Sequence, residues 1–232
     1  MNIAIILASG VGKRMGAEKN KVLLNIDRRP VIFYAIKAFE KNNDIEEIII
    51  VTRKEEFSDF KKLAKKYKFK KIKGVVAGGK ERQDSAYNGL KYLDEKATDK
   101  NDIIVFHNGA NPFVTTKEIS ESIKEAKRCG ACVVAHPTKD TVKEVNKRGL
   151  VEKTLERKKL WCMQTPQTIR YELALEAFKK ANKDKFLGTD DVSLVERLGN
   201  KVKVILGSPH NMKITTPLDF KLAKIIIRDY EF

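Results

Sequence analysis

The feature that most constrains the fold is a regular alternation of short apolar runs and amphipathic segments. Runs rich in valine and isoleucine occur at residues 3–7, 47–52, 72–76, 103–106 and 131–135, and helical patterns lie between them at about 30–41, 56–67, 81–94 and 116–128. Strands that are apolar throughout are buried on both faces, as they are in a parallel sheet that helices cover on each side. The alternation therefore predicts an α/β fold around a mostly parallel sheet.

Four of these runs end in polar or glycine-rich segments, namely Ala8-Ser9-Gly10, Ala77-Gly78-Gly79, His107-Asn108-Gly109 and His136-Pro137. The carboxyl ends of parallel strands meet at one edge of a sheet, and the ligands of such proteins bind beyond that edge. We therefore expect the four segments to line one shared cleft.

The first run opens into a glycine-rich, basic loop, Leu7–Lys21, with the sequence LASGVGKRMGAEKNK. Gly10 and Gly12 can adopt positive φ angles and let backbone N–H groups approach an anion closely. Charge around the same place comes from Lys13, Arg14, Lys19 and Lys21. A loop of this kind at the end of the first strand predicts a phosphate-binding site for a nucleotide, and with it an enzyme.

Spacing within the loop separates three common phosphate-binding patterns. The Walker pattern fails because Leu7 stands at its first glycine position and Arg14 at its hydroxyl position. The dinucleotide pattern fails because its third glycine is displaced to Gly16, and because the next apolar run ends in Arg53 instead of an acidic residue. A nucleotidyltransferase loop needs an arginine and a downstream lysine, which Arg14 and Lys21 provide. A basic surface loop is the remaining alternative.

The composition sets further limits. A chain of 232 residues with 42% hydrophobic residues is long enough for one sizeable α/β domain. Apolar runs fall short of the roughly 20 residues that span a membrane, and the chain moves directly into a strand without a signal segment, so we expect a cytoplasmic protein. The formal charge of +16 is spread through amphipathic helices. It predicts a solvated surface that attracts anionic substrates, and no nucleic-acid partner.

The cysteines and the single tryptophan are expected to be structural. Cys129 and Cys132 form a C-x-x-C that follows a helical pattern, whereas redox pairs open a helix. A second pair that could complete a zinc site is missing. We therefore expect these two and Cys162 to be buried thiols, and Trp161 to pack in the core.

The alternation breaks between residues 138 and 160. Two β-patterns, Thr141–Val145 and Val151–Leu155, flank a turn near Asn146–Gly149 and predict a hairpin. Because it has no place in a parallel sheet, we expect an arm that covers a site or pairs with a second subunit. Helical patterns at 171–182, 190–198 and 217–230 complete the chain.

Several motifs together carry a family resemblance: LASGVGKRMG, GGKERQDSAYNGL, His107–Pro112, KDTVK, TLERKKLW, QTPQ, TDD and NMKITTP. From end to end the chain resembles the 2-C-methyl-D-erythritol 4-phosphate cytidylyltransferases of non-mevalonate isoprenoid synthesis. The GG-x-ERQDS and QTPQ segments are the more specific signals, because many sugar-nucleotide pyrophosphorylases share the loop. The ribitol-5-phosphate cytidylyltransferases are the nearest other group, and a nucleotide-binding homologue without catalysis is a further alternative.

The resemblance implies a single Rossmann-like nucleotidyltransferase domain over residues 1–232, with the arm at about 138–160. It also implies a reaction in which the phosphate of a sugar-alcohol phosphate attacks the α-phosphorus of CTP and pyrophosphate leaves. A divalent ion, Mg²⁺, would bridge the phosphates of CTP. Because both reactants are anions, positioning and charge neutralisation would supply most of the catalysis.

The resemblance further implies a role for each matched residue. Arg14 and Lys21 match the transition-state stabilisers, and Arg157 and Lys213 match the pair that orients the attacking phosphate. In the family that arginine comes from the arm of a neighbouring subunit, which implies a homodimer. The phosphates would lie on Ala8, Ser9, Gly10 and Gly12, the cytidine beside Gly79, Arg82 and Ser85, and the acceptor on Thr141 and Thr189. Thr189 also suits the N-cap of the helix at 190–198.

One segment departs from the family pattern. The family has H-D-A-A-R-P where this chain has His107-Asn108-Gly109-Ala110-Asn111-Pro112. An asparagine binds hydroxyl groups but cannot neutralise a phosphate as an arginine does. We therefore expect Asn108 and Asn111 to contact the acceptor and to tune which acceptor is used.

Overall fold

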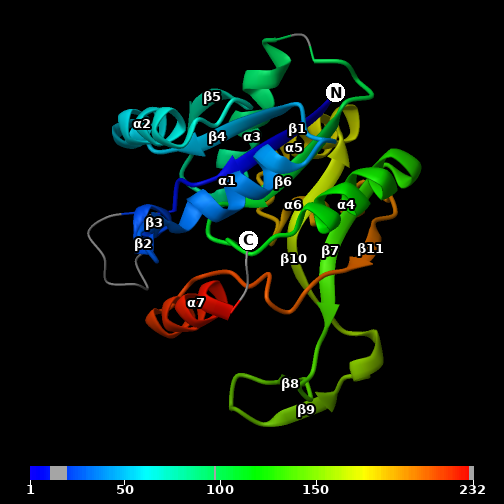
Figure 1. Cartoon of the computed structure of the whole chain (residues 1–232). Helices are drawn as coiled ribbons and strands as arrows, with labels where there is room; N and C mark the ends of the chain where they lie inside the picture. The colour runs from blue at the N-terminus through cyan, green and yellow to red at the C-terminus, as the bar shows by residue number, and fades with distance from the viewer. Residues whose placement is uncertain (11–19, 97, 230–232) are drawn as a thin grey trace.

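A seven-stranded sheet forms the centre of the molecule in the computed structural model, which describes residues 1–10, 20–96 and 98–229 (Figure 1). Its strands lie in the order β11-β7-β10-β6-β1-β4-β5. Their bounds are β1 (Asn2–Leu7), β4 (Glu47–Thr52), β5 (Ile72–Ala77), β6 (Ile103–Asn108), β7 (Ala131–Pro137), β10 (Trp161–Arg170) and β11 (Lys203–Leu206). Adjacent strands are parallel except where β10 pairs with β6 and β7. The predicted α/β fold with a mostly parallel sheet is confirmed.

Two strands, β10 and β11, were not expected. Pro166 and the polar residues around it make β10 unlike a core strand in sequence. The strand tolerates them because its buried polar side chains are hydrogen-bonded, as Thr168 is to Ser122 at 2.8 Å between their Oγ atoms. Because β10 is antiparallel, its first residue, Trp161, pairs with Pro137 at the carboxyl edge of β7. This brings the QTPQ segment to the edge where the parallel strands end.

Helices cover both faces of the sheet. On one face lie α3 (Arg82–Asp94), α5 (Tyr171–Lys183) and α6 (Asp191–Arg197), and on the other α1 (Val31–Lys41), α2 (Phe57–Tyr67) and α4 (Thr116–Cys129). Each buries an apolar stripe; in α1 it consists of Ile32, Ile36 and Phe39, which lie on one side of a helix. Buried Ile5 of β1 pairs in register with Ile49 and Phe106 on the flanking strands.

A third apolar cluster lies beside the sheet. The last helix, α7 (Pro217–Asp229), packs Phe220 and Ala223 there with Tyr34 and Phe113. The short pair β2 (Asn25–Ile26) and β3 (Arg29–Pro30) contributes Ile26. The described residues also form three single-turn helices, η2 (Lys21–Leu23), η3 (Lys54–Glu56) and η4 (Arg157–Lys159).

The hairpin is an exposed arm, as expected. Strands β8 (Lys143–Val145) and β9 (Val151–Thr154) pair antiparallel, and all of their residues are exposed. Figure 1 shows the arm projecting away from the sheet beyond the end of β7. Within the part of the chain that the structure describes, no helix is long and apolar enough to cross a membrane.

Three local expectations are wrong. Trp161 is 39% exposed instead of packed in the core, because it begins β10 at the base of the arm. Cys129 and Cys162 are exposed, and only Cys132 is buried, where burial raises the pKa of its thiol to about 12. The N-cap of α6 is Asp190, not Thr189; its carboxylate accepts a hydrogen bond from the Ser193 N–H at 3.0 Å.

Candidate active site

Two adjoining cavities lie at the carboxyl edge of the sheet, where the four polar strand ends were expected to meet. The first has a volume of about 460 Å³ and is lined by Ala8, Ser9 and Gly10 after β1, Arg53 after β4, Gly79 after β5, and Lys21. The second, of about 520 Å³, is lined by residues that include Asn111, His136, Thr165, Thr189 and Asp190. Arg82, Asn108 and Lys213 line both. Two ligands held in these cavities would therefore meet at the three shared residues.

Most of the predicted site residues line these cavities. The first contains Ala8, Ser9, Gly10, Lys21, Gly79 and Arg82, and the second contains Asn111 and Thr189, with Asn108 and Lys213 shared. Gly12 and Arg14 lie outside the described residues. Thr141 and Arg157 are exposed on the arm and line neither cavity of their own chain.

Ser85 holds the wall of the first cavity together. It is buried, and its Oγ lies 2.9 Å from the Oγ of Ser9 and accepts the Gly79 N–H at 3.0 Å. A Cβ at Gly78 would come within 2.5 Å of Ser9, and one at Gly79 within 2.2 Å of Asp84. Gly78 therefore lets the segment after β5 approach the segment after β1 closely, and Gly79 lets it approach the first turn of α3.

The buried carboxylate of Glu56 binds Arg53 and also Asn20, the residue before Lys21. Its Oε2 accepts hydrogen bonds from Thr52 at 2.6 Å and from Asn20 at 3.0 Å, and its Oε1 accepts Arg53 Nε at 3.1 Å. Burial by itself would raise the pKa of Glu56, but these hydrogen bonds outweigh it and hold the pKa below its ordinary value. Asn20 is also the N-cap of η2, which begins at Lys21. The carboxylate thus joins η2 to the end of β4.

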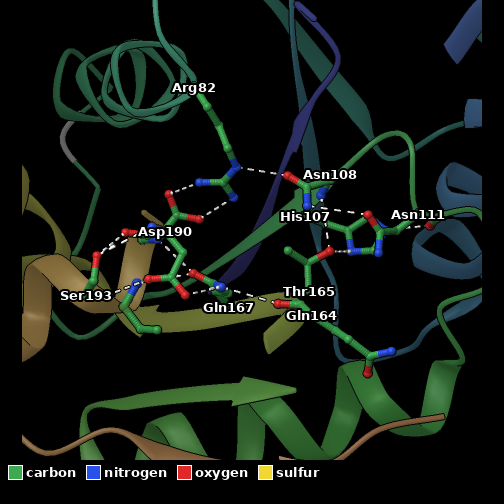
Figure 2. A network of polar contacts seen from close by, with 11 residues as sticks. Arg82, His107, Asn108, Asn111, Gln164, Thr165, Gln167, Asp190 and Ser193 are labelled. Atoms are coloured by element: carbon green, nitrogen blue, oxygen red, sulfur yellow. Dashed lines mark hydrogen bonds and ion pairs between the residues drawn. The ribbon is translucent and has the colours of Figure 1, made fainter. Parts of the chain in front are cut away.

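Arg82, at the boundary of the cavities, is held by a bidentate ion pair (Figure 2). Its Nη1 and Nη2 donate to the two carboxylate oxygens of Asp191 at 2.7 and 2.6 Å, and its Nε donates to Asn108 Oδ1 at 3.0 Å. Burial alone would lower the pKa of Arg82, but the charge of Asp191 and the hydrogen bonds to it outweigh burial and hold the pKa above its ordinary value. Gln167 of β10 supports the pair by accepting the Asp191 N–H at 2.8 Å. The guanidinium is therefore fixed and largely neutralised.

His107 is fully buried and lies next to Asn108 and Asn111 (Figure 2). Its Nε2 lies 2.9 Å from the Asn111 carbonyl oxygen, and its Nδ1 lies 2.9 Å from Thr165 Oγ1. A carbonyl only accepts, so Nε2 carries the proton and Nδ1 accepts from the threonine hydroxyl. Burial lowers the pKa of His107 to about 4. The imidazole is therefore a neutral support of the cavity wall.

A family model described as 2-C-methyl-D-erythritol 4-phosphate cytidylyltransferase matches residues 2–229. The chain belongs to this family. The resemblance that the motifs carried is thereby confirmed.

Individual members are similar over nearly their whole length. The 2-C-methyl-D-erythritol 4-phosphate cytidylyltransferase of Clostridioides difficile is 45% identical over 228 residues, which cover 98% of this chain and 94% of that protein. The one from Bacillus cytotoxicus is 46% identical over 224 residues, covering 97% and 96%. The crystal structure of 4-diphosphocytidyl-2C-methyl-D-erythritol synthase from Anaerococcus prevotii has a TM-score of 0.85, at 30% identity and with 98% and 96% coverage.

The two asparagines that depart from the cytidylyltransferase pattern are engaged within the protein. Asn111 is 2% exposed, and its Nδ2 donates to the Asn211 carbonyl at 3.2 Å. The Oδ1 of Asn108 accepts from Arg82, so its Nδ2 faces Asn111 Oδ1 at 3.4 Å. Neither amide brings charge to the second cavity, where the family motif has an acid and an arginine.

The structure adds site residues that the sequence did not indicate. Arg53 lines the first cavity. In the sequence it was noted only as the end of an apolar run, where its positive charge argued against a dinucleotide site. Thr215 also lines the first cavity, and Thr165 and Asp190 line the second. Thr165 and Asp190 fall within the QTPQ and TDD motifs, so the motifs were a signal that could have found them.

Proposed function

We propose that this protein transfers the cytidylyl group of CTP to 2-C-methyl-D-erythritol 4-phosphate and releases pyrophosphate. The observation that carries the proposal is the pair of adjoining cavities that share Arg82, Asn108 and Lys213, in a chain that belongs to this cytidylyltransferase family. Each cavity has the size of a small-ligand site. Two ligands with a common boundary are what a group transfer between them requires.

In this proposal the first cavity takes CTP. The backbone after β1, at Ala8, Ser9 and Gly10, faces the triphosphate together with Gly12, and Gly79 and Ser85 form the nucleoside end. Lys21 and Arg14 stabilise the charge that builds up on the leaving pyrophosphate.

The second cavity takes the acceptor, with Thr189, Asn108 and Asn111 in its wall. Lys213 lies at the boundary, where it orients the attacking phosphate. An oxygen of that phosphate bonds to the α-phosphorus of CTP, and the bond from the α-phosphorus to the bridging oxygen breaks, so that pyrophosphate takes the electron pair. Both partners are anions, so cations at this boundary lower the barrier by reducing their repulsion.

Mg²⁺ is the cofactor we assign to the reaction. The described residues contain no group of three metal-ligating side chains, and the carboxylate among the described residues of the first cavity is that of Glu81. This donor set suits an ion that the nucleotide phosphates and water hold, because Mg²⁺ keeps several waters when it binds substrate phosphates. When bound, the ion would neutralise the triphosphate.

We also infer a homodimer in which the arms are exchanged, built from one domain over residues 1–232 with the arm at about 138–160. Arg157 and Thr141, whose family counterparts contact the acceptor, lie on the arm outside both cavities of their own chain. The arm also exposes Val145, Leu150 and Val151. An arm that reaches the site of a second copy would bury this apolar surface and complete that site.

The test is pyrophosphate release from CTP and Mg²⁺ with a panel of acceptors. We expect turnover with 2-C-methyl-D-erythritol 4-phosphate to exceed that with ribitol 5-phosphate and glycerol 3-phosphate. A preference for ribitol 5-phosphate would assign another polyol phosphate as the substrate. Binding of CTP without turnover on any acceptor would indicate a nucleotide-binding homologue.

A further inference from the structure

The second cavity contains a titratable side chain that none of the roles above uses, that of His136. It is the penultimate residue of β7, at the carboxyl edge of the sheet, and lines the cavity together with Asn111, Thr189 and Lys213. We propose that His136, in its protonated form, binds the anionic acceptor and supplies the positive charge that Asn111 cannot. The proposal rests on the proposed function, because it concerns the acceptor cavity of that reaction.

The other described charged side chains around this cavity largely offset one another, so an additional positive charge would change the net charge there. Arg82 and Lys213 line it as cations, and Asp190 lines it as an anion. Arg82 is paired with Asp191 through two short hydrogen bonds, so its charge is already offset. The two cations and these two carboxylates balance formally. A proton on His136 therefore adds a positive charge to the described part of this cavity wall, where a phosphate would bind.

The hydrogen bonding of His136 favours protonation at a defined atom. Its Nδ1 lies 3.1 Å from the carbonyl oxygen of Pro137, which only accepts, so Nδ1 carries a proton and donates. Nε2 is then the nitrogen that takes up the second proton and becomes a donor to an anion. His136 is only partly exposed, so its charge is less screened by water than that of a fully exposed residue.

Other titratable groups face this region from the elements packed against β7. Cys162 of β10 is the cross-strand partner of His136, and Glu118 of α4 accepts the Ser208 N–H at 2.7 Å beside the cavity. Among the described residues, Asp190, Arg82 and Lys213 also line the cavity, and Asp191 pairs with Arg82. These groups, and the substrate phosphates, are present in both the wild type and a His136 variant. The ratio of the two proteins at each pH therefore isolates the imidazole.

The experiment measures the Michaelis constants (KM) for the acceptor and for CTP at pH 6.0, 7.5 and 9.0, and the acceptor used is methylerythritol phosphate. His136→Gln keeps a hydrogen-bonding amide and loses the charge, and His136→Lys keeps a charge. At pH 6.0 we expect His136→Gln to raise the acceptor KM roughly tenfold, the scale of one charge-assisted hydrogen bond. The ratio should fall toward one by pH 9.0, because the proposal assigns the effect to the protonated imidazole alone.

Two further variants complete the comparison. His136→Lys should keep the acceptor KM low at pH 9.0, and the KM for CTP should change little in either variant. His210→Ala is the matched control, because His210 is exposed and next to the lining residues Pro209 and Asn211 but does not line the cavity. An acceptor KM in His136→Gln that equals the wild-type value at pH 6.0 would overturn the proposal while leaving the proposed function intact.

A binding measurement separates failure of this proposal from failure of the proposed function. The acceptor is titrated into protein with ¹⁵N-labelled histidines, with CTP present and the divalent ion removed so that turnover does not occur. A shift of the His136 signal that is larger at pH 6.0 than at pH 9.0 supports the proposal even in a protein without turnover. An unchanged His136 signal at saturating acceptor contradicts it.

Discussion

At the scale of single residues, this site depends on buried side chains that are held in one protonation state. His107 is the clearest case, because both ring nitrogens are hydrogen-bonded and burial lowers its pKa to about 4. An unfolded histidine titrates near pH 6.5. Between about pH 4 and 6.5 the unfolded chain therefore binds a proton at this position that the folded chain does not.

This difference predicts a stability that rises with pH. The contribution of His107 is fully present above about pH 6.5 and is lost progressively as the pH falls toward 4, on the order of 3 kcal/mol in all. His107→Gln should be less stable than wild type at pH 7.5, and the gap should narrow at pH 5. Urea unfolding of both proteins at the two pH values measures this. His210→Ala is the control. A stability difference between His107→Gln and wild type that does not change with pH would contradict a neutral His107 in the folded protein.

At the scale of elements, hydrogen bonds and ion pairs between segments distant in the sequence hold the edge of the sheet together. Glu56 joins η2, β4 and η3 through Asn20, Thr52 and Arg53. Hydrogen bonds that outweigh burial keep its pKa below the ordinary value, so its contribution to stability is present at neutral pH. It is lost as the pH falls below the ordinary range of glutamic acid, near pH 4.

We therefore expect Glu56→Gln to lower the free energy of unfolding at pH 7 by about 2 kcal/mol, the scale of hydrogen bonds to a buried charge. It should also raise the KM for CTP, because Arg53 and η2, the short helix that begins at Lys21, lose their shared support. Glu55→Gln is the matched control, since Glu55 is exposed beside it on η3. Chemical unfolding and CTP kinetics provide the two measurements. Equal free energies of unfolding for the two variants would show that the hydrogen bonds of Glu56 contribute nothing to stability.

The elements that the sequence could predict are those with a strong apolar period. Buried runs such as 47–52 and the stripe of α1 were predicted, as were the polar strand ends that line the cavities. Strand β10 was not predicted, because its apolar content is low and a proline interrupts it. The ion pair of Arg82 with Asp191 could not be predicted either. It joins residues 109 positions apart and depends on how α3 and α6 meet over the sheet.

At the scale of the whole molecule, the arm residues that we propose for the acceptor site lie outside both cavities of their own chain. Arg157 donates to the Lys139 carbonyl at 3.1 Å within its own arm, outside both cavities. Lys21, by contrast, lines the first cavity. If arms are exchanged, a complete site combines Lys21 of one copy with Arg157 of a second copy.

Co-expression of a Lys21→Ala chain with an Arg157→Ala chain tests this arrangement. Each variant alone should be nearly inactive, since every site lacks one cation. In random mixtures half of the dimers pair the two variants, and one of the two sites in each is then intact, so activity should return to about a quarter of the wild-type value. The control replaces the Arg157→Ala chain with one that carries both substitutions, which should restore nothing. Activity in the first mixture no higher than in this control would mean that each site is built from one chain.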